Sequence, residues 1–230
     1  MPKNLNNTNN VPTDIPVITI DGPGGSGKGT IGLLLAKKLG WHFLDSGALY
    51  RILAFAALQQ QIDLTNEPKI AALAEVIDIQ FNRDIFLNGQ CVTDSIRSEN
   101  CGDAASKIAV YPAIRTALLD KQRAFCQPPG LVADGRDMGT VVFPRAFVKL
   151  FLEASVEERA KRRYFQLKDK EQSVTLQSLL EEIAARDARD KSRVTAPLKP
   201  AEDAVVIDTT GLGIEEVFDR VMAEVKSRLY

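Results

Sequence analysis

Apolar and polar positions follow two different periods along the chain. Short, largely apolar runs are typical of strands that are buried in a sheet. Such runs lie at residues 17–20, 41–44, 131–133, 147–152 and 204–208. Apolar residues at helical spacing come after them, most clearly at residues 31–39, 48–60, 114–125, 176–193 and 214–229. This alternation predicts an α/β fold with one parallel sheet covered by helices on both faces.

One stretch interrupts the alternation. Residues 77–81 and 84–92 are typical of short antiparallel strands, and the Asn88-Gly89 dipeptide is a hairpin signal. We therefore expect residues 62–110 to form a small inserted substrate-binding domain, within a core built from residues 17–61 and 111–230. Residues 1–16 are rich in asparagine and can bury little apolar surface, so we expect them to be a disordered tail.

Composition limits the classes of function. The chain has 230 residues, and 29 Lys and Arg against 30 Asp and Glu give a net charge of −1. This balance argues against a broad nucleic-acid or anionic membrane surface. The three cysteines fit neither a metal motif nor an even set of disulfides, which favours a reducing cytosol. With neither a membrane-length apolar run nor a secretion signal, we expect a cytoplasmic protein, and by default a monomer.

Residues 21–30, DGPGGSGKGT, lie between a predicted strand and a predicted helix. Glycines allow backbone N–H groups to surround an anion, and the helix N-terminus adds partial positive charge. Two motifs overlap here. Gly22-x-Gly24-x-x-Gly27 satisfies the dinucleotide fingerprint, which would indicate an NAD-dependent dehydrogenase, whereas Gly22-x-x-x-x-Gly27-Lys28 satisfies the P-loop frame.

Lys28 favours the P-loop, because a terminal triphosphate needs a lysine there and a dinucleotide does not. The frame departs from its usual form at Gly29, and the hydroxyl that can join a Mg²⁺ shell comes one residue late, at Thr30. The GKGT variant is associated with nucleoside monophosphate kinases. We expect ATP to bind Gly22, Pro23, Gly24, Gly25, Ser26, Gly27, Lys28, Gly29 and Thr30.

Polar residues follow two of the predicted strands, where ligands bind in open α/β sheets. The first group is Asp45, Ser46, Tyr50 and Arg51, of which Arg51 offers a fork for a phosphate. Asp45 or Ser46 could instead only cap the next helix. The only histidine, His42, is expected to be packed rather than catalytic.

The second group is Asp134, Arg136 and Asp137, in the sequence ADGRDMGT. Asp134 could hold Mg²⁺ directly or through water, and Arg136 and Asp137 could reach a substrate in the same crevice. A plain turn is the alternative for this group.

Two later helices carry arginines on one face. Ser155-x-x-Glu158 predicts a capping box, and the helix after it places Arg159, Arg162 and Arg163 together, before a polar stretch that would suit a lid over residues 159–172. This face could instead simply be solvated.

The next helix has a stripe that starts as core and ends in Arg186, Asp190 and Arg193. Charges that continue a core-facing stripe favour a crevice lining. The alternative is an ion-paired helix end, with Arg186 bonded to Asp190.

The sequence resembles the bacterial cytidylate kinases over nearly the whole chain after about residue 16. The resemblance is carried by DGPGGSGKGT at 21–30, LDSGALYR at 44–51, ADGRDMGTVVFP at 133–144 and RDARDKSR at 186–193. It implies a P-loop nucleoside monophosphate kinase fold with an inserted, β-containing CMP-binding domain and a short lid. It also implies transfer of phosphate from ATP to CMP or dCMP, giving CDP or dCDP, as in pyrimidine metabolism.

The resemblance also implies roles for individual residues. Ser106, Arg115 and Asp137 would contact the cytosine edge, with Arg136 beside them, although spacing alone does not single out Ser106 or Arg115. The remaining CMP contacts would be Ser46, Tyr50, Arg51, Arg186, Asp190 and Arg193. The catalytic cations would be Lys28, Arg162, Arg163 and Arg193, and the Mg²⁺ contacts would be Thr30 and Asp134.

We expect direct in-line transfer, since the acceptor phosphate is already an anion and needs no general base. Three alternatives stay open at this point. The acceptor could be UMP, AMP or shikimate; the protein could be a regulatory ATPase without an acceptor; or it could be the dehydrogenase that the dinucleotide fingerprint allows.

Overall fold

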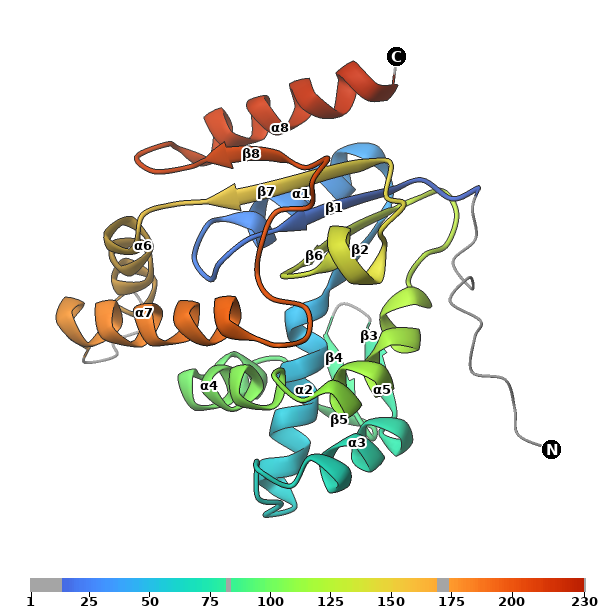
Figure 1. Ribbon diagram of the computed structural model, residues 1–230, viewed down its shortest axis with the longest axis vertical. Coiled ribbons are helices and arrows are strands. Elements are labelled where there is room, and N and C mark those ends of the chain that lie inside the picture. Colours follow the sequence, from blue (N-terminus) through green and yellow to red (C-terminus); the bar gives the residue numbers. More distant parts are fainter. Residues whose placement is uncertain (1–13, 82–83, 169–173, 230) are drawn as a thin grey trace.

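A computed structural model describes residues 14–81, 84–168 and 174–229. Its main sheet has five parallel strands in the order β2-β6-β1-β7-β8 (Figure 1). These strands are β1 (Val17–Asp21), β2 (His42–Asp45), β6 (Leu131–Gly135), β7 (Val148–Glu153) and β8 (Val205–Asp208). The parallel sheet predicted from the short apolar runs is confirmed.

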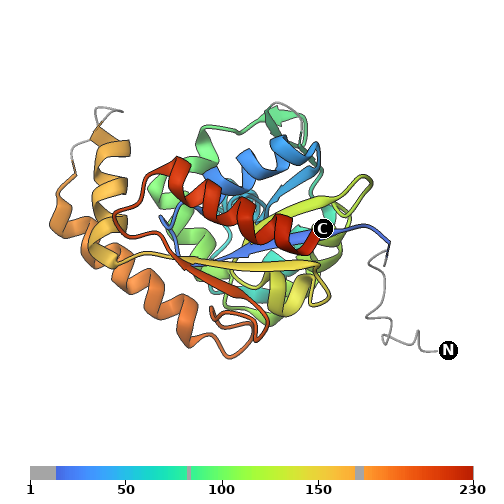
Figure 2. The ribbon, with the colours of Figure 1, turned by 90° about the horizontal axis from the view of Figure 1, so that it is seen from above.

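Helices cover both faces of this sheet, as Figures 1 and 2 show. On one side α1 (Lys28–Leu39) and α8 (Ile214–Leu229) pack against β1, β7 and β8, and their apolar side chains share one buried cluster. On the other side lie α2 (Ser46–Gln59) and α5 (Pro112–Arg123). A π-helical turn, η2 (Met138–Val142), follows β6 in the chain. The helices α6 (Val156–Lys168) and α7 (Leu176–Ser192) stand at the ends toward which the strands point.

A second apolar core lies away from the main sheet. It joins α2 and α5 to α3 (Glu67–Val76), α4 (Glu99–Ile108) and a small antiparallel sheet. That sheet consists of β3 (Ile79–Phe81), β4 (Ile85–Leu87) and β5 (Gln90–Cys91), and a 3₁₀ turn, η1 (Ser95–Arg97), follows it. The predicted hairpin is confirmed, because Asn88 and Gly89 both have positive φ between β4 and β5. The cluster runs from Ala48 to Leu118, so this core extends into the helices that flank the expected insertion.

Two earlier expectations concern a disordered tail over residues 1–16 and cysteines that form no disulfides. Residues 1–13 lie outside the described part, whereas Ile15 packs against the sheet and the Pro16 carbonyl accepts a hydrogen bond from Leu131 N at 3.0 Å. The folded body therefore begins before residue 17. All three cysteines are free thiols.

One local expectation was wrong, and another was confirmed only in part. His42 is exposed, because the edge strand β2 turns it outward, and its Nε2 lies 2.9 Å from the Pro128 carbonyl. The capping box at the start of α6 forms only in one direction: Ser155 Oγ accepts from Glu158 N at 3.1 Å. Ser155 N donates to Thr210 Oγ1, and the Glu158 carboxylate turns to Arg162 instead.

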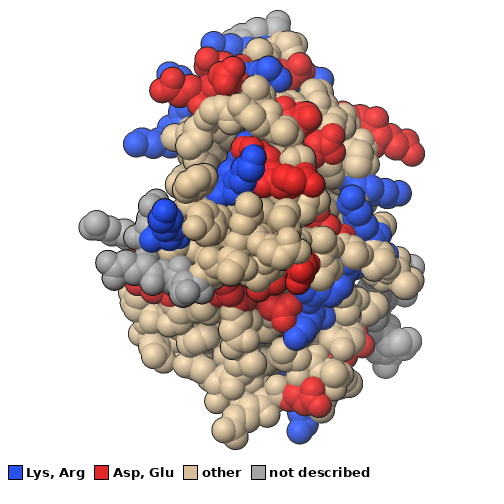
Figure 3. Space-filling view, turned by 90° about the vertical axis from the view of Figure 1, so that its left-hand side faces the viewer, with Lys and Arg blue, Asp and Glu red and all other residues tan. Residues whose placement is uncertain are grey.

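Two observations concern partners. In the described residues, no helix is long and apolar enough to cross a membrane. On the face toward which the sheet strands point, basic and acidic side chains are interspersed (Figure 3). This mixture is consistent with the near-neutral net charge.

Candidate active site

A cleft of about 1220 Å³ opens at the carboxyl ends of the sheet strands. The glycine loop forms one wall, and residues of α2, α4, α6 and α7 form the others. Among the described residues, eight arginines line it: Arg51, Arg97, Arg136, Arg159, Arg162, Arg163, Arg186 and Arg189. Such a concentration of guanidinium groups in one hollow suits a strongly anionic ligand.

The glycine loop has the backbone that an anion site needs. Gly25 and Gly27 adopt left-handed φ values of 81° and 89°, which residues other than glycine rarely adopt. Gly22 passes so close to β7 that an added Cβ would lie 2.0 Å from the Leu152 carbonyl oxygen. The sequence pattern therefore reflects both loop curvature and close contact between strands.

Lys28 is the first residue of α1 and is buried at 7 % exposure. Its Nζ donates to the Pro23 carbonyl at 2.9 Å, so the side chain lies back over the loop. Burial, together with the nearby charge of Arg136, lowers the pKa of Lys28 to about 8. An anionic ligand in the loop would restore this pKa, because it would favour the charged ammonium.

Asp134, at the end of β6, lies beside Lys28, with 3.9 Å between Asp134 Oδ1 and Lys28 Nζ. Burial raises the pKa of its carboxyl to about 6. A Cβ on Gly29 would stand 3.1 Å from Asp134 Oδ2. This contact gives a physical reason for glycine, rather than Ser or Thr, after the lysine: a larger side chain would press on the carboxylate.

Asp21 connects the two strand ends. Its carboxylate accepts hydrogen bonds from Met138 N and Gly139 N, both at 2.8 Å, so the end of β1 fixes the segment after β6. Burial raises the pKa of Asp21 to about 7, although these two donors act in the opposite direction.

Behind the cleft lies a buried cluster of predicted nucleotide contacts. Arg115 on α5 forms an ion pair with Asp137, donates to the Ala109 carbonyl at 3.1 Å, and lies 5.8 Å above the Tyr50 ring. The Tyr50 hydroxyl and the Ser106 hydroxyl are buried and have no hydrogen-bond partner among the described residues. A buried polar atom without a partner is a candidate for contact with a ligand.

Asp190 joins α7 to this cluster. Its carboxylate accepts from Arg136 Nε at 3.0 Å and forms an ion pair with Arg193. The alternative pair, Arg186 with Asp190, does not form as a hydrogen bond in the structure. Arg186 faces the cleft with a buried Nε that has no partner among the described residues, and burial lowers its pKa to about 9.

The polar residues at the end of β2 and in α2 have different partners. Asp45 Oδ1 caps α2 by accepting from Ala48 N at 3.0 Å, which is the structural alternative considered above. Ser46 Oγ donates to Gln122 Oε1 at 2.8 Å. Arg51 lines the cleft and donates to the Ile96 carbonyl at 3.3 Å.

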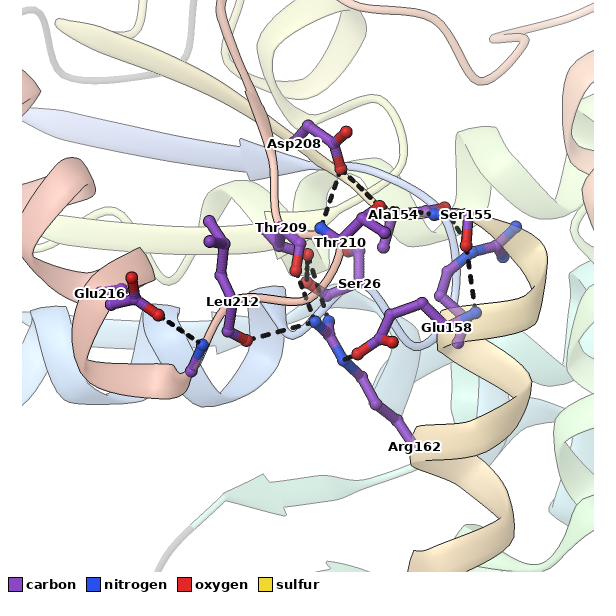
Figure 4. A network of polar contacts seen from close by, with 12 residues as sticks. Ser26, Ala154, Ser155, Glu158, Arg162, Asp208, Thr209, Thr210, Leu212 and Glu216 are labelled. Carbon is purple, nitrogen blue, oxygen red and sulfur yellow. Dashed lines mark hydrogen bonds and ion pairs between the residues drawn. The ribbon is translucent and has the colours of Figure 1, made fainter.

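Arg162 is held at the edge of the glycine loop (Figure 4). It bonds Glu158 Oε1 at 2.9 Å and the Thr209 carbonyl at 2.6 Å, while Thr209 Oγ1 lies 3.1 Å from Ser26 O of the loop. Arg163 pairs with Glu99 of α4 instead. The expected single arginine face of α6 is thus divided among different partners.

Arg159, on the same helix, is a structural residue. It is 2 % exposed, and its guanidinium bonds Asp187 of α7 with both nitrogens, at 3.0 and 2.5 Å. It also donates to the Gly24 carbonyl at 3.2 Å, so it ties α6 and α7 to the glycine loop.

Two comparisons with known proteins name the same family. The family model of cytidylate kinase matches residues 18–227. A cytidylate kinase of Stutzerimonas stutzeri is 61% identical over 221 residues, which cover 93% of this chain and 96% of that protein. One from Shewanella denitrificans is 57% identical, over 93% of this chain and 97% of its own. The chain belongs to the cytidylate kinase family.

Family membership raises the question of Mg²⁺, which usually accompanies ATP in kinases. Thr30 lines the cleft and the Asp134 carboxylate lies over Gly29, so hydroxyl and carboxylate oxygens stand beside the glycine loop. In the described residues no group of three or more His, Cys, Asp or Glu could hold a metal. Mg²⁺ in nucleotide sites is held by one or two carboxylates and the phosphates, so one carboxylate beside a hydroxyl is a sufficient contribution from the protein. The residues therefore fit the ion.

Four residues that the structure places in the site were not identified from the sequence. They are Asp21, Gln122, Asp187 and Thr209, and each acts through a backbone group or a neighbouring side chain. Only Asp21 has a usable signal, because an acid directly before the glycine loop is buried where the strand ends. The others depend on contacts between segments far apart in the chain.

Proposed function

We propose that this member of the cytidylate kinase family phosphorylates CMP and dCMP with ATP, by direct in-line transfer of the γ-phosphoryl group. The observation that carries the proposal is the adjacency of two sites. A triphosphate loop with a buried lysine opens into the same cleft as Arg136 and Arg186, and behind these lies the Arg115–Asp137 pair.

The donor phosphates would bind to the N–H groups of the glycine loop and to Lys28. Thr30 and Asp134 would hold Mg²⁺, directly or through water, and this ion supplies positive charge to the phosphates when bound. Residues Gly22 to Thr30 form this subsite, in which Gly22 and Pro23 shape the loop rather than line the cleft.

The acceptor would lie between α2, α4, α5 and α7. Ser106, Arg115 and Asp137 would contact the cytosine edge, whose N4 donates and whose N3 and O2 accept. Arg51, Arg186 and Arg193 would bind phosphate and sugar; Ser46, Tyr50, Arg136 and Asp190 complete this subsite.

The arginines of α6 would act when the cleft closes. Arg162 and Arg163 are now bonded to Glu158, Thr209 and Glu99, and would exchange these partners for phosphate oxygens. Such closure excludes water, which would otherwise hydrolyse ATP. Part of the proposed lid, residues 169–172, lies outside the described residues. The proposed domains stay at 62–110 for CMP binding and 159–172 for the lid, and we propose a cytoplasmic monomer.

A coupled assay of ADP formation tests the proposal. Mg-ATP is supplied with CMP, dCMP, UMP, AMP, shikimate or no acceptor, one at a time. Turnover with CMP and dCMP far above the others is expected. Equal ADP release without an acceptor would instead indicate an ATPase.

A further inference from the structure

The Ser46 hydroxyl has a fixed hydrogen-bonding direction. Ser46 is 4 % exposed and Gln122 is 2 % exposed, and Ser46 Oγ lies 2.8 Å from Gln122 Oε1. A serine hydroxyl has one proton to donate and lone pairs to accept with, so its role depends on where that proton points.

Gln122 decides the direction of this bond. Its Nε2 donates to the Leu118 carbonyl at 3.3 Å, and a carbonyl can only accept. The amide nitrogen must therefore face Leu118, which leaves the amide oxygen facing Ser46. Because an amide oxygen cannot donate, Ser46 must give its only proton to Gln122. Towards any other group, Ser46 is an acceptor only.

This pair lies beside the proposed base-binding cluster. Ser46 follows Asp45, which pairs across the sheet with Asp134, three residues before Asp137. One helical turn after Ser46, Tyr50 lies under Arg115. Arg115 and Gln122 are seven residues apart on α5, a spacing that places them on the same helix face.

We propose that Gln122 is a positioning residue that makes Ser46 an obligate acceptor and so favours a base with an exocyclic amino group. The inference rests on the proposed function, with CMP as acceptor. A cytosine N4 amino group has two protons, for which the Asp137 carboxylate and Ser46 Oγ are two acceptors. Uracil has a carbonyl oxygen at that position, which would face lone pairs and gain no hydrogen bond.

The test compares kcat/KM for CMP and for UMP in Gln122→Met. Methionine fills a similar volume but accepts no proton from Ser46, so the hydroxyl can rotate and donate to uracil O4. The CMP-to-UMP ratio is expected to fall about tenfold, the effect of one neutral hydrogen bond. Gln127→Met is the control, because exposed Gln127 also donates to a backbone carbonyl but lies outside the cleft.

A second pair of variants separates positioning from structural damage. Ser46→Ala removes the acceptor, so kcat/KM for CMP should fall while that for UMP stays within about twofold. In the Ser46→Ala background, Gln122→Met should not change the ratio further. Gln122→Glu keeps an acceptor towards Ser46 and should preserve the ratio.

Two results would overturn the role of Gln122: an unchanged ratio in Gln122→Met, or the same fall in the ratio when Ser46 is already alanine. If Gln122→Met does not fold, an unchanged ratio in Ser46→Ala overturns it equally. A wild-type enzyme that does not prefer CMP to UMP would refute the proposed function itself, which is a separate outcome.

Discussion

At the scale of single residues, the site contains charged groups that are buried before any ligand arrives. Lys28 and Arg186 both have lowered pKa values because burial disfavours their charged forms. A phosphate that enters the site would stabilise the charged forms of both residues, since the anion replaces the hydration that burial removes. Their placement favours transfer by positioning and charge stabilisation over acid–base chemistry.

Lys28→Ala tests this view of the donor site. We expect turnover with CMP to fall by at least about a hundredfold, as for the loss of one preorganised charge donor. CMP binding, measured by calorimetry without ATP, should stay within about threefold of wild type, because Lys28 belongs to the donor subsite. Turnover within a few-fold of wild type would show that the role assigned to Lys28 is wrong.

Asp21 gives a prediction about pH. Its pKa is about 7 in the folded chain and 3.8 in a model carboxyl, so the folded state holds a proton that the unfolded state releases. The contribution of protonated Asp21 to the free energy of unfolding is complete below about pH 4 and is lost as the pH rises through about 7.

The variant Asp21→Asn does not titrate there and serves as the reference. The free energy of unfolding of wild type minus that of the variant should fall by about 2–4 kcal/mol between pH 4 and pH 8. Urea unfolding at several pH values measures this difference. A difference that is flat or rises with pH would contradict the assignment.

Residue-level prediction from sequence was possible where chemistry is local. The glycine loop, Lys28 and the cluster from Asp134 to Asp137 follow directly from residue type and order. Ser106 and Arg115 could be named only through the family resemblance, because helices separate them from any motif. Gln122 could not be named at all, since its role depends on a single contact with Ser46, 76 positions away.

At the scale of elements, ion pairs between helices fall into two classes. Arg159 and Asp187 join α6 to α7 with side chains only 3 % and 12 % exposed. Arg189 and Asp103 join α7 to α4 at 2.7 Å, but these side chains are 32 % and 45 % exposed. Only the first pair is expected to matter for stability, because water screens the second.

Two matched variants test this contrast. Asp187→Ala leaves a buried guanidinium without its carboxylate and should lower the free energy of unfolding by about 3 kcal/mol. Asp103→Ala should change it by less than about 1 kcal/mol. Chemical unfolding of both variants measures the effect, and equal losses would contradict the account of the two pairs.

At the scale of the whole molecule, the two largest of the four apolar clusters in the described residues belong to different parts of the fold. One core holds the parallel sheet with α1 and α8, and the other holds α2 to α5 with the small sheet. The strand–helix periodicity predicted the parallel sheet, and the Asn88-Gly89 signal predicted the hairpin of the small sheet. The packing of α6 against α7 combines an apolar contact of Ala160, Leu167 and Leu179 with the buried Arg159–Asp187 pair. That pair could not be predicted, since its partners are 28 positions apart in the chain.

The central claim is that phosphate moves from ATP to an acceptor nucleotide held in the same cleft. The most direct test incubates the enzyme with Mg-ATP and CMP, and measures ADP and CDP together by chromatography. The account predicts one CDP for each ADP, and almost no ADP when CMP is left out. ADP formed without an equal amount of CDP would contradict it.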